Sequence, residues 1–159
     1  RAATSAPHWI VYRLADIYLM KAEALAVSGS TPADFDQVAT LCNLTYVRSH
    51  PDGADSLDHA LSTDNSSAYS LVMDERRREF AFEGKRWFDL LRQVRRAGGP
   101  SEGVINSLVA NKYSGTAPDG ITGKLSSMGY WYWPIYKNEM DVNKRLVQND
   151  YYQLQESEH

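Results

Sequence analysis

The stretch DERRREFAFEGKRWFDLLR, Asp74–Arg92, interleaves acidic residues and arginines with large aromatic residues. On an α-helix, where each residue advances by about 100°, the apolar side chains of this region form one stripe roughly 100° wide. The members of the stripe are Val72, Met73, Phe80, Trp87, Leu90, Leu91 and Val94. A helix surrounded by solvent has no need of so many aromatic residues. The pattern therefore predicts one core helix over residues 68–96, ended by the AGGP sequence that follows it.

Four charged residues lie on or beside this stripe, namely Arg76, Glu79, Glu83 and Arg86. Their spacing of about one and two helical turns lets Arg76 reach Glu79 or Glu83. We interpret the four as a structural ion-pair cluster, in which loss of one partner costs ~3–5 kcal/mol if the pair is buried. The alternative is an acid/base pair formed by the two glutamates, as in retaining glycosidases. Arginines keep nearby carboxylates ionised, whereas an acid catalyst needs a raised pKa, so the pattern favours the structural interpretation.

The composition excludes several classes of function. The chain has 159 residues, which is enough for one domain with a hydrophobic core. Its net charge of −3 argues against electrostatic binding to nucleic acid. Its single cysteine, Cys42, excludes an intrachain disulfide and a multi-cysteine zinc site. The histidines show no paired ligand spacing, and no nucleophile-elbow motif is present. We therefore expect no metal site and no cofactor, and the sequence offers no support for nucleophilic catalysis.

The N-terminal part predicts a pair of helices. Residues 9–28 carry apolar side chains at the three-four spacing of a helix, and Thr31 followed by Pro32 is typical of the start of a second helix. The short connection predicts an antiparallel hairpin that partly matches a tetratricopeptide unit. Ile17 and Met20 make the first helix apolar on a second side as well, so we expect another surface to cover it.

The whole sequence indicates a mainly α fold in a single domain over residues 1–159. Its expected parts are a tetratricopeptide-like helical hairpin at 1–48, a polar loop at 49–67 and the long charged and aromatic helix at 68–96. Residues 97–159 are rich in turn-forming residues and predict an irregular C-terminal region with little strand.

The aromatic run GYWYWPIY, residues 129–136, alternates like a short strand that ends at Pro134. Such a strand places Trp131 and Trp133 on one face and Tyr130 and Tyr132 on the other. If one face is exposed, its flat rings are candidates for stacking on a sugar. The alternative is a buried strand beside the core, which is the more common place for large aromatic side chains.

Three segments in order resemble the C-terminal part of the SusD/RagB family: RLADIYLMKAEAL (13–25), ERRREFAFEGKRWFDLLR (75–92) and YWPIYKNEMDVNKRLVQNDYY (132–152). The middle segment matches the family pattern at Glu75, Arg76, Arg77, Glu83, Gly84, Arg86, Trp87, Asp89 and Leu90. The last segment matches at Pro134, Ile135, Glu139, Asn143, Gln148 and Asn149, with Tyr136 in place of the second proline of the family.

The resemblance implies a surface glycan-binding lipoprotein of Bacteroidota that binds oligosaccharides for nutrient uptake and is not an enzyme. It implies a position at the cell outer membrane, facing outward, with the lipid anchor on a part of the parent protein that this chain lacks. The expected partners are a SusC-like TonB-dependent transporter, an oligosaccharide and the missing N-terminal part of the same protein. No binding residue follows from the matched motifs.

Two other functions stay open at the level of the sequence. The helical hairpin is compatible with a tetratricopeptide-like protein-interaction domain that binds no sugar. The two glutamates at 79 and 83 are compatible with a carbohydrate hydrolase only if both face solvent.

Overall fold

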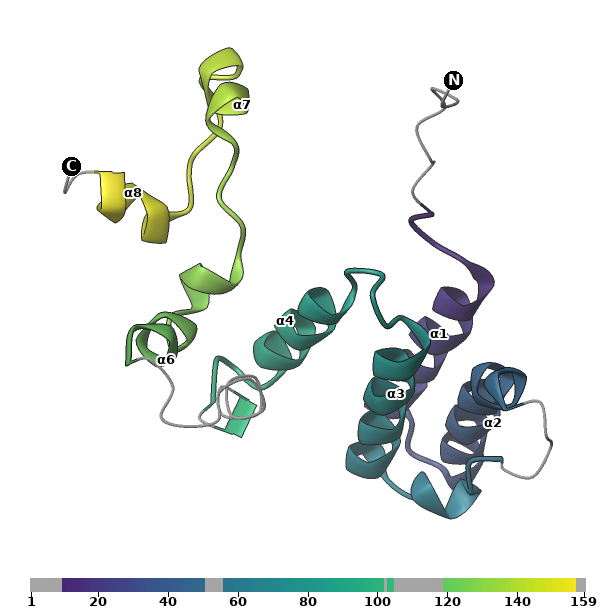
Figure 1. Cartoon of the computed structure of the whole chain (residues 1–159). Helices are drawn as coiled ribbons and strands as arrows, with labels where there is room; N and C mark the ends of the chain where they lie inside the picture. The colour runs from purple at the N-terminus through teal and green to yellow at the C-terminus, as the bar shows by residue number, and fades with distance from the viewer. Residues whose placement is uncertain (1–9, 51–55, 102, 105–118, 157–159) are drawn as a thin grey trace, which may run out of the picture. The chain divides into compact units, whose positions relative to one another are not determined.

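The computed structural model describes residues 10–50, 56–101, 103–104 and 119–156, and these residues form helices and connecting segments without any strand (Figure 1). The predicted mainly α fold is confirmed. The chain divides into two compact units, residues 1–87 and residues 88–159.

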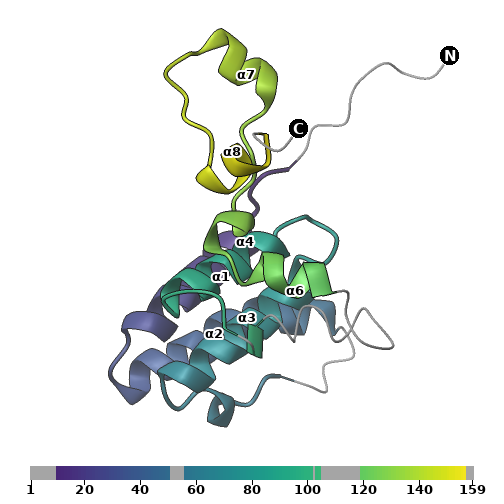
Figure 2. The ribbon, with the colours of Figure 1, turned by 90° about the vertical axis from the view of Figure 1, so that its left-hand side faces the viewer.

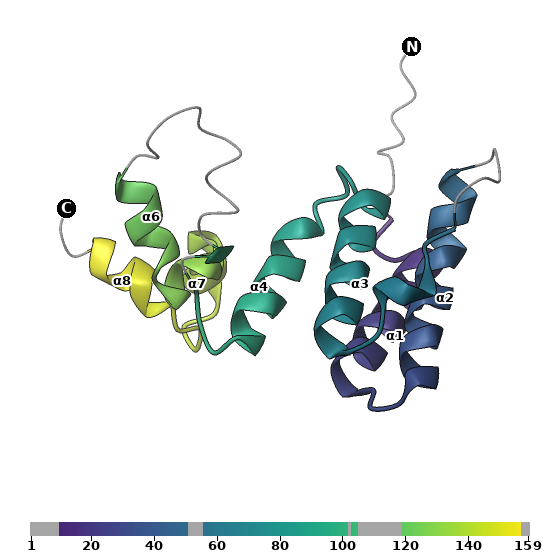
Figure 3. The same ribbon diagram turned by 90° about the horizontal axis from the view of Figure 1, so that it is seen from below.

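The first unit is a group of three helices. Its elements are α1 Leu14–Ser28, α2 Pro32–Ser49, the 3-10 helix η1 His59–Leu61 and α3 Asn65–Glu79. Figures 1 and 3 both show α1, α2 and α3 side by side, and each of the three contacts the other two. Their shared core consists of Ala15, Leu19, Ala22, Ala26, Phe35, Val38, Ala39, Leu41, Cys42, Ala68, Leu71, Val72 and Phe80. The small alanines of α1 allow its neighbours to approach closely.

Side-chain caps set the starts of these helices. The Thr31 hydroxyl accepts a hydrogen bond from the backbone N–H of Asp34, and the Asp34 carboxylate accepts one from the backbone N–H of Thr31. The helix predicted from residue 9 begins at Leu14 instead. Arg13 is the N-cap residue and has an extended backbone conformation. Its backbone N–H donates to the Asp16 carboxylate at 2.9 Å, and the first helical turn begins at the next residue, Leu14.

The single helix predicted over residues 68–96 was wrong. The structure has two helices there, α3 and α4 Arg86–Arg96, separated by a turn. The backbone leaves the right-handed helical region at Phe82, with φ of 66°, and at Gly84, with φ of 74°. Glycine adopts such a conformation without strain, whereas a phenylalanine does so at a cost of about 1 kcal/mol or more. The turn therefore needs support from the contacts around it.

The second unit holds most of α4, together with α6 Asp119–Leu125, the 3-10 helix η2 Met128–Trp131, α7 Lys137–Val142 and α8 Asp150–Glu156. Figure 2 shows the chain running from η2 through α7 and returning to α8, which contacts η2. The predicted strand at 129–136 was wrong as well, because its first part is η2 and the rest is extended chain without a strand partner among the described residues.

The C-terminal end of α4 is closed by a Schellman motif. The Gly99 N–H donates to the Val94 carbonyl and the Gly98 N–H donates to the Arg95 carbonyl, at 3.0 and 3.1 Å. Gly98 has φ of 83°, a conformation that favours glycine at this position. In this motif, two carbonyls at the end of α4 accept hydrogen bonds from N–H groups of the same chain.

Candidate functional site

An ionic network surrounds the turn between α3 and α4. The Arg13 guanidinium binds the carboxylates of Glu79 and Glu83 together, with 2.7 Å between Nη2 and Glu83 Oε1. It also donates to the Glu79 backbone carbonyl at 2.6 Å. Arg48 of α2 pairs with the same Glu79 carboxylate, which is only 4% exposed. Two arginines from distant segments therefore hold the C-terminal end of α3.

Lysine and aspartate residues complete this network on the other side of the turn. The Lys85 ammonium lies 2.7 Å from both carboxylate oxygens of Asp16 and 3.2 Å from Glu83 Oε2. The Phe80 ring lies beneath the cations, with Lys85 Nζ 4.5 Å and the Arg13 guanidinium carbon 4.8 Å from its centroid. The turn is therefore fixed on both sides by contacts with the start of α1.

The carboxyl groups of Asp16 and Glu83 are held in the ionised form. The side-chain hydrogen bond from Arg13 is the largest cause that lowers the pKa of Glu83 below its usual value. Burial alone raises the pKa of Asp16, but the hydrogen bonds from Lys85 and from the Arg13 backbone outweigh it, so that this pKa is lowered. An acid catalyst needs a shift in the opposite direction. The geometry thus argues for a structural role of this region.

Residues predicted to form the ion-pair cluster are placed as follows. Glu79 and Glu83 share Arg13, while Arg76 is buried and forms an ion pair with Glu23 of α1 at 3.9 Å. Arg86 is partly buried at the first residue of α4. The contact of Arg13 with Glu79 was not predictable from local spacing, because Arg13 lies 66 residues before Glu79.

The four aromatic residues proposed for glycan binding do not share an exposed face. Trp131 is fully buried, and its Nε1–H donates to the Leu125 carbonyl at 2.8 Å. Tyr130 is partly buried with its ring edge against Tyr151. Tyr132 and Trp133 are 37% and 70% exposed. The 3-10 turn of η2 breaks the strand-like alternation, so Trp131 and Trp133 do not lie on the same side.

Exposed aromatic side chains instead gather in the extended segment 132–136, which we call the aromatic segment. Its exposed rings belong to Tyr132, Trp133 and Tyr136. The buried Gln148 amide holds this segment by accepting from the Ile135 N–H at 2.9 Å and donating to the Ile135 carbonyl at 3.0 Å. The backbone that carries these rings is thus braced by hydrogen bonds to a buried side chain.

A second amide fixes the start of this region. Asn149 Nδ2 donates to the Gly129 carbonyl at 2.7 Å, and its Oδ1 accepts from the Tyr151 N–H at 3.1 Å. A Cβ atom on Gly129 would lie 2.9 Å from the Cβ of Tyr151, so this close approach requires glycine. The Gln-Asn pair of the third motif therefore has a structural role that its sequence alone did not reveal.

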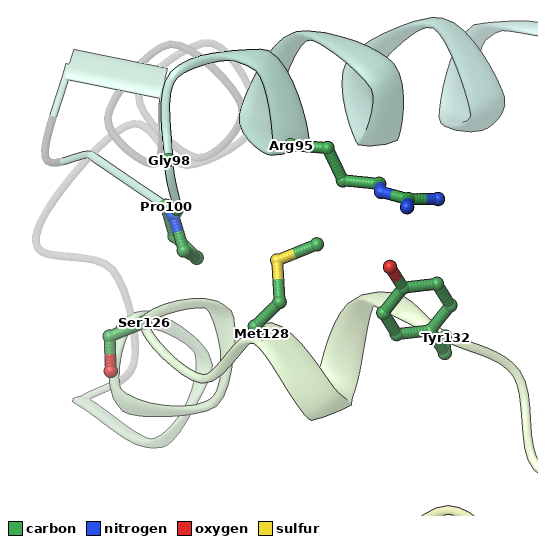
Figure 4. A pocket seen from close by; sticks show the side chains of 7 residues that line it. Arg95, Gly98, Pro100, Ser126, Met128 and Tyr132 are labelled. Atoms are coloured by element: carbon green, nitrogen blue, oxygen red, sulfur yellow. The ribbon is translucent and has the colours of Figure 1, made fainter.

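A cavity of about 390 Å³ lies within the second unit (Figure 4). Its walls are formed by the end of α4 with the residues that follow it, and by the segment that runs from Ser126 through η2 to Tyr132. The lining residues are Arg95, Gly98, Gly99, Pro100, Ser126, Met128 and Tyr132. In Figure 4 the Tyr132 hydroxyl points toward the wall that carries Arg95, the Met128 side chain projects into the space between the walls, and the Ser126 hydroxyl points away. Tyr132 thus belongs to both the cavity and the aromatic segment.

Comparison with known proteins adds the family. A family model described as the SusD family matches residues 1–152 of the chain. The chain belongs to the SusD family. No curated protein and no solved structure matches it.

SusD-family proteins are binding proteins of nutrient uptake that are associated with the outer membrane, and they are not enzymes. No helix in the described ranges of this SusD-family chain is long and apolar enough to cross a membrane. Among the same residues, no group of three histidine, cysteine, aspartate or glutamate side chains is placed to hold a metal ion.

Proposed function

We propose that this SusD-family chain binds oligosaccharides at the outer face of the outer membrane and acts in their uptake with a SusC-like TonB-dependent transporter. The observation that carries the proposal is the family match over residues 1–152. In this proposal, a lipid anchor attaches the protein to the outer membrane. The transporter contact is testable by co-purification of the tagged protein from outer membranes.

The aromatic segment is the part of the chain that we assign to sugar contact. Flat aromatic faces stack on the C–H faces of pyranose rings, and tryptophan and tyrosine bring large contact area with few side-chain torsions to immobilise. Trp133 and Tyr136 are 70% and 68% exposed. Because Gln148 already fixes the backbone at Ile135, little further ordering of the segment accompanies binding.

A protein-interaction domain is the second candidate function, and one observation favours it. The side of α1 away from the core carries exposed apolar side chains at helical spacing, including Leu14, Ile17 and Val27. Such an exposed apolar stripe suits the apolar surface of a protein partner better than the polar surface of a soluble sugar. Both functions are compatible in one molecule, because the stripe and the aromatic segment belong to different units.

A glycan array tests the proposal. The wild-type protein is compared with Trp133→Ala, Tyr136→Ala and the control Tyr12→Ala, whose ring is as exposed as that of Tyr136, at 68% each. We expect saccharide binding by the wild-type protein and by the control, with a loss of at least about tenfold in affinity in the other two variants, since one aromatic stacking contact contributes about 1.5 kcal/mol. An absence of saccharide binding by a folded wild-type protein across a broad array contradicts the proposal and favours the protein-interaction function.

A further inference from the structure

Arg95 differs from Arg78 of α3 and from Arg92 of α4 in its surroundings. Arg78 pairs with Glu75 at 3.0 Å and Arg92 pairs with Asp89 at 2.8 Å. Among the described residues, no carboxylate lies within ion-pair distance of Arg95, although its side chain lines the cavity. A guanidinium is always charged at neutral pH and presents five N–H donors. The cavity thus contains a cation whose donors are available to a ligand.

The other lining residues that the structure describes do not neutralise this charge. None of them is acidic, and Met128 and Pro100 contribute apolar surface. The carbonyls of Val94 and Arg95 at the end of α4 are engaged by the N–H groups of Gly99 and Gly98. These two acceptors are therefore already bonded within the chain, and neither needs the Arg95 guanidinium as its donor.

Size and shape fit a small ligand. A volume of about 390 Å³ lies at the lower end of the ~300–1,000 Å³ range of ligand pockets. The Tyr132 hydroxyl is directed toward the wall that carries Arg95, and Met128 lies between the two walls (Figure 4). A ligand that suits this lining has a negative group for Arg95, a hydroxyl for Tyr132 and an apolar face for Met128.

We propose that this cavity binds a negatively charged sugar residue, a uronic acid or a sulfate ester, with Arg95 as the ligand of the anionic group. This inference rests on the proposed function and specifies its substrate class. Guanidinium binds carboxylate and sulfate oxygens through paired charge-assisted hydrogen bonds. Since Tyr132 is also the first residue of the aromatic segment, the next sugar along the chain of an oligosaccharide is expected to contact Trp133.

Calorimetric titration tests this proposal with three probes: an oligogalacturonide, a sulfated oligosaccharide and a neutral oligosaccharide. The probes are titrated into wild-type protein, Arg95→Gln and the control Arg96→Gln. Arg96 lies in the same last turn of α4 but does not line the cavity, so its replacement removes the same charge from the same place in the chain. The two acidic probes distinguish carboxylate from sulfate recognition.

We expect at least one acidic probe to bind the wild-type protein and Arg96→Gln about equally, and to bind Arg95→Gln at least about tenfold more weakly, the usual effect of losing a hydrogen bond to a charged group. The affinity for the acidic probe should also fall as the salt concentration rises from about 20 to about 500 mM. The contact is partly exposed, so dissolved ions screen the attraction between Arg95 and the anionic group.

Two results overturn the inference, and they are distinguishable. If an acidic probe binds Arg95→Gln as tightly as the wild-type protein, or if only neutral saccharides bind, Arg95 does not select an anion, while the proposed sugar binding stands. If no saccharide of either kind binds the folded wild-type protein, the proposed function fails together with the inference.

Discussion

The two units of this chain use polar side chains in different ways. In residues 1–87, charged groups meet within the protein, as in the contacts of Arg13 with Glu79 and Glu83. In residues 88–159, the amides of Gln148 and Asn149 fix backbone that presents Tyr132 and Trp133 to solvent. The first arrangement satisfies its charges internally, whereas the second leaves aromatic faces and the Arg95 cavity accessible. We infer that the first unit serves as architecture and the second as the binding surface.

The largest expected effect is that of Arg13→Ala. Among the described residues, it leaves the nearly buried Glu79 with Arg48 as its remaining ion-pair partner, and it removes the shared partner of Glu83. We predict a loss of about 3 kcal/mol in the free energy of unfolding, measured by urea denaturation. The matched control is Arg77→Ala, whose exposed pair with Asp74 should contribute less than about 0.5 kcal/mol. Equal effects of the two replacements would contradict the architectural role of the network.

Gln148→Ala should have the next largest effect. It leaves the N–H and the carbonyl of Ile135 without their side-chain partners. We predict a loss of about 2 kcal/mol and a larger loss of sugar affinity than of affinity for any protein partner of α1. The exposed Asn138→Ala serves as the control and should change the stability by less than about 0.5 kcal/mol. Unchanged stability of Gln148→Ala would show that the aromatic segment is not braced in this way.

Acid should weaken the first unit. The ordinary pKa values of Asp16 and Glu83 are 3.8 and 4.5, and both are lowered in the folded protein. A lowered folded pKa means that the stabilisation is present above the ordinary value and is lost as the pH falls through the folded value. The free energy of unfolding should therefore decrease below about pH 4.5, and Arg13→Ala should show a shallower decrease. An equally steep decrease in that variant would show that Arg13 does not lower the pKa of Glu83.

Cys42 provides the smallest and most local effect. It is buried in the core of the first unit, and burial, followed by the charge of Glu75, raises the pKa of its thiol to about 12. We predict no measurable reaction of the folded protein with a thiol reagent at pH 8 within minutes, because the thiolate is the reactive form. Arg13→Ala should react faster, since it opens this unit more often. Rapid labelling of the wild-type protein would contradict the burial of this core.

The sequence carried enough information for the helical hairpin and little for the contacts between distant segments. The apolar spacing and the Thr31-Pro32 signal predicted α1 and α2 because both are local effects. The break between α3 and α4 was missed because Leu90 and Val94 continue the phase of the apolar stripe, although Gly84 was a local signal for it.

The candidate site was only partly predictable for a related reason. Alternation predicted that Trp131 and Trp133 share a face, but the 3-10 helix η2 turns one ring into the core and leaves the other exposed. The cavity depends on Arg95 meeting Met128 and Tyr132, which lie more than 30 residues further along the chain. A periodic pattern in the sequence does not indicate which residues from distant segments line the same cavity.

One pair of variants tests the central claim most directly. The affinity of Trp133→Ala and of Arg13→Ala for a saccharide identified on the array is measured by calorimetry at a temperature at which both remain folded, together with the stability of each. We predict that Trp133→Ala loses at least about tenfold in affinity with little change in stability, while Arg13→Ala loses stability and keeps its affinity. The reverse pattern, or equal affinity of Trp133→Ala and the wild-type protein, would contradict the assignment of binding to the second unit.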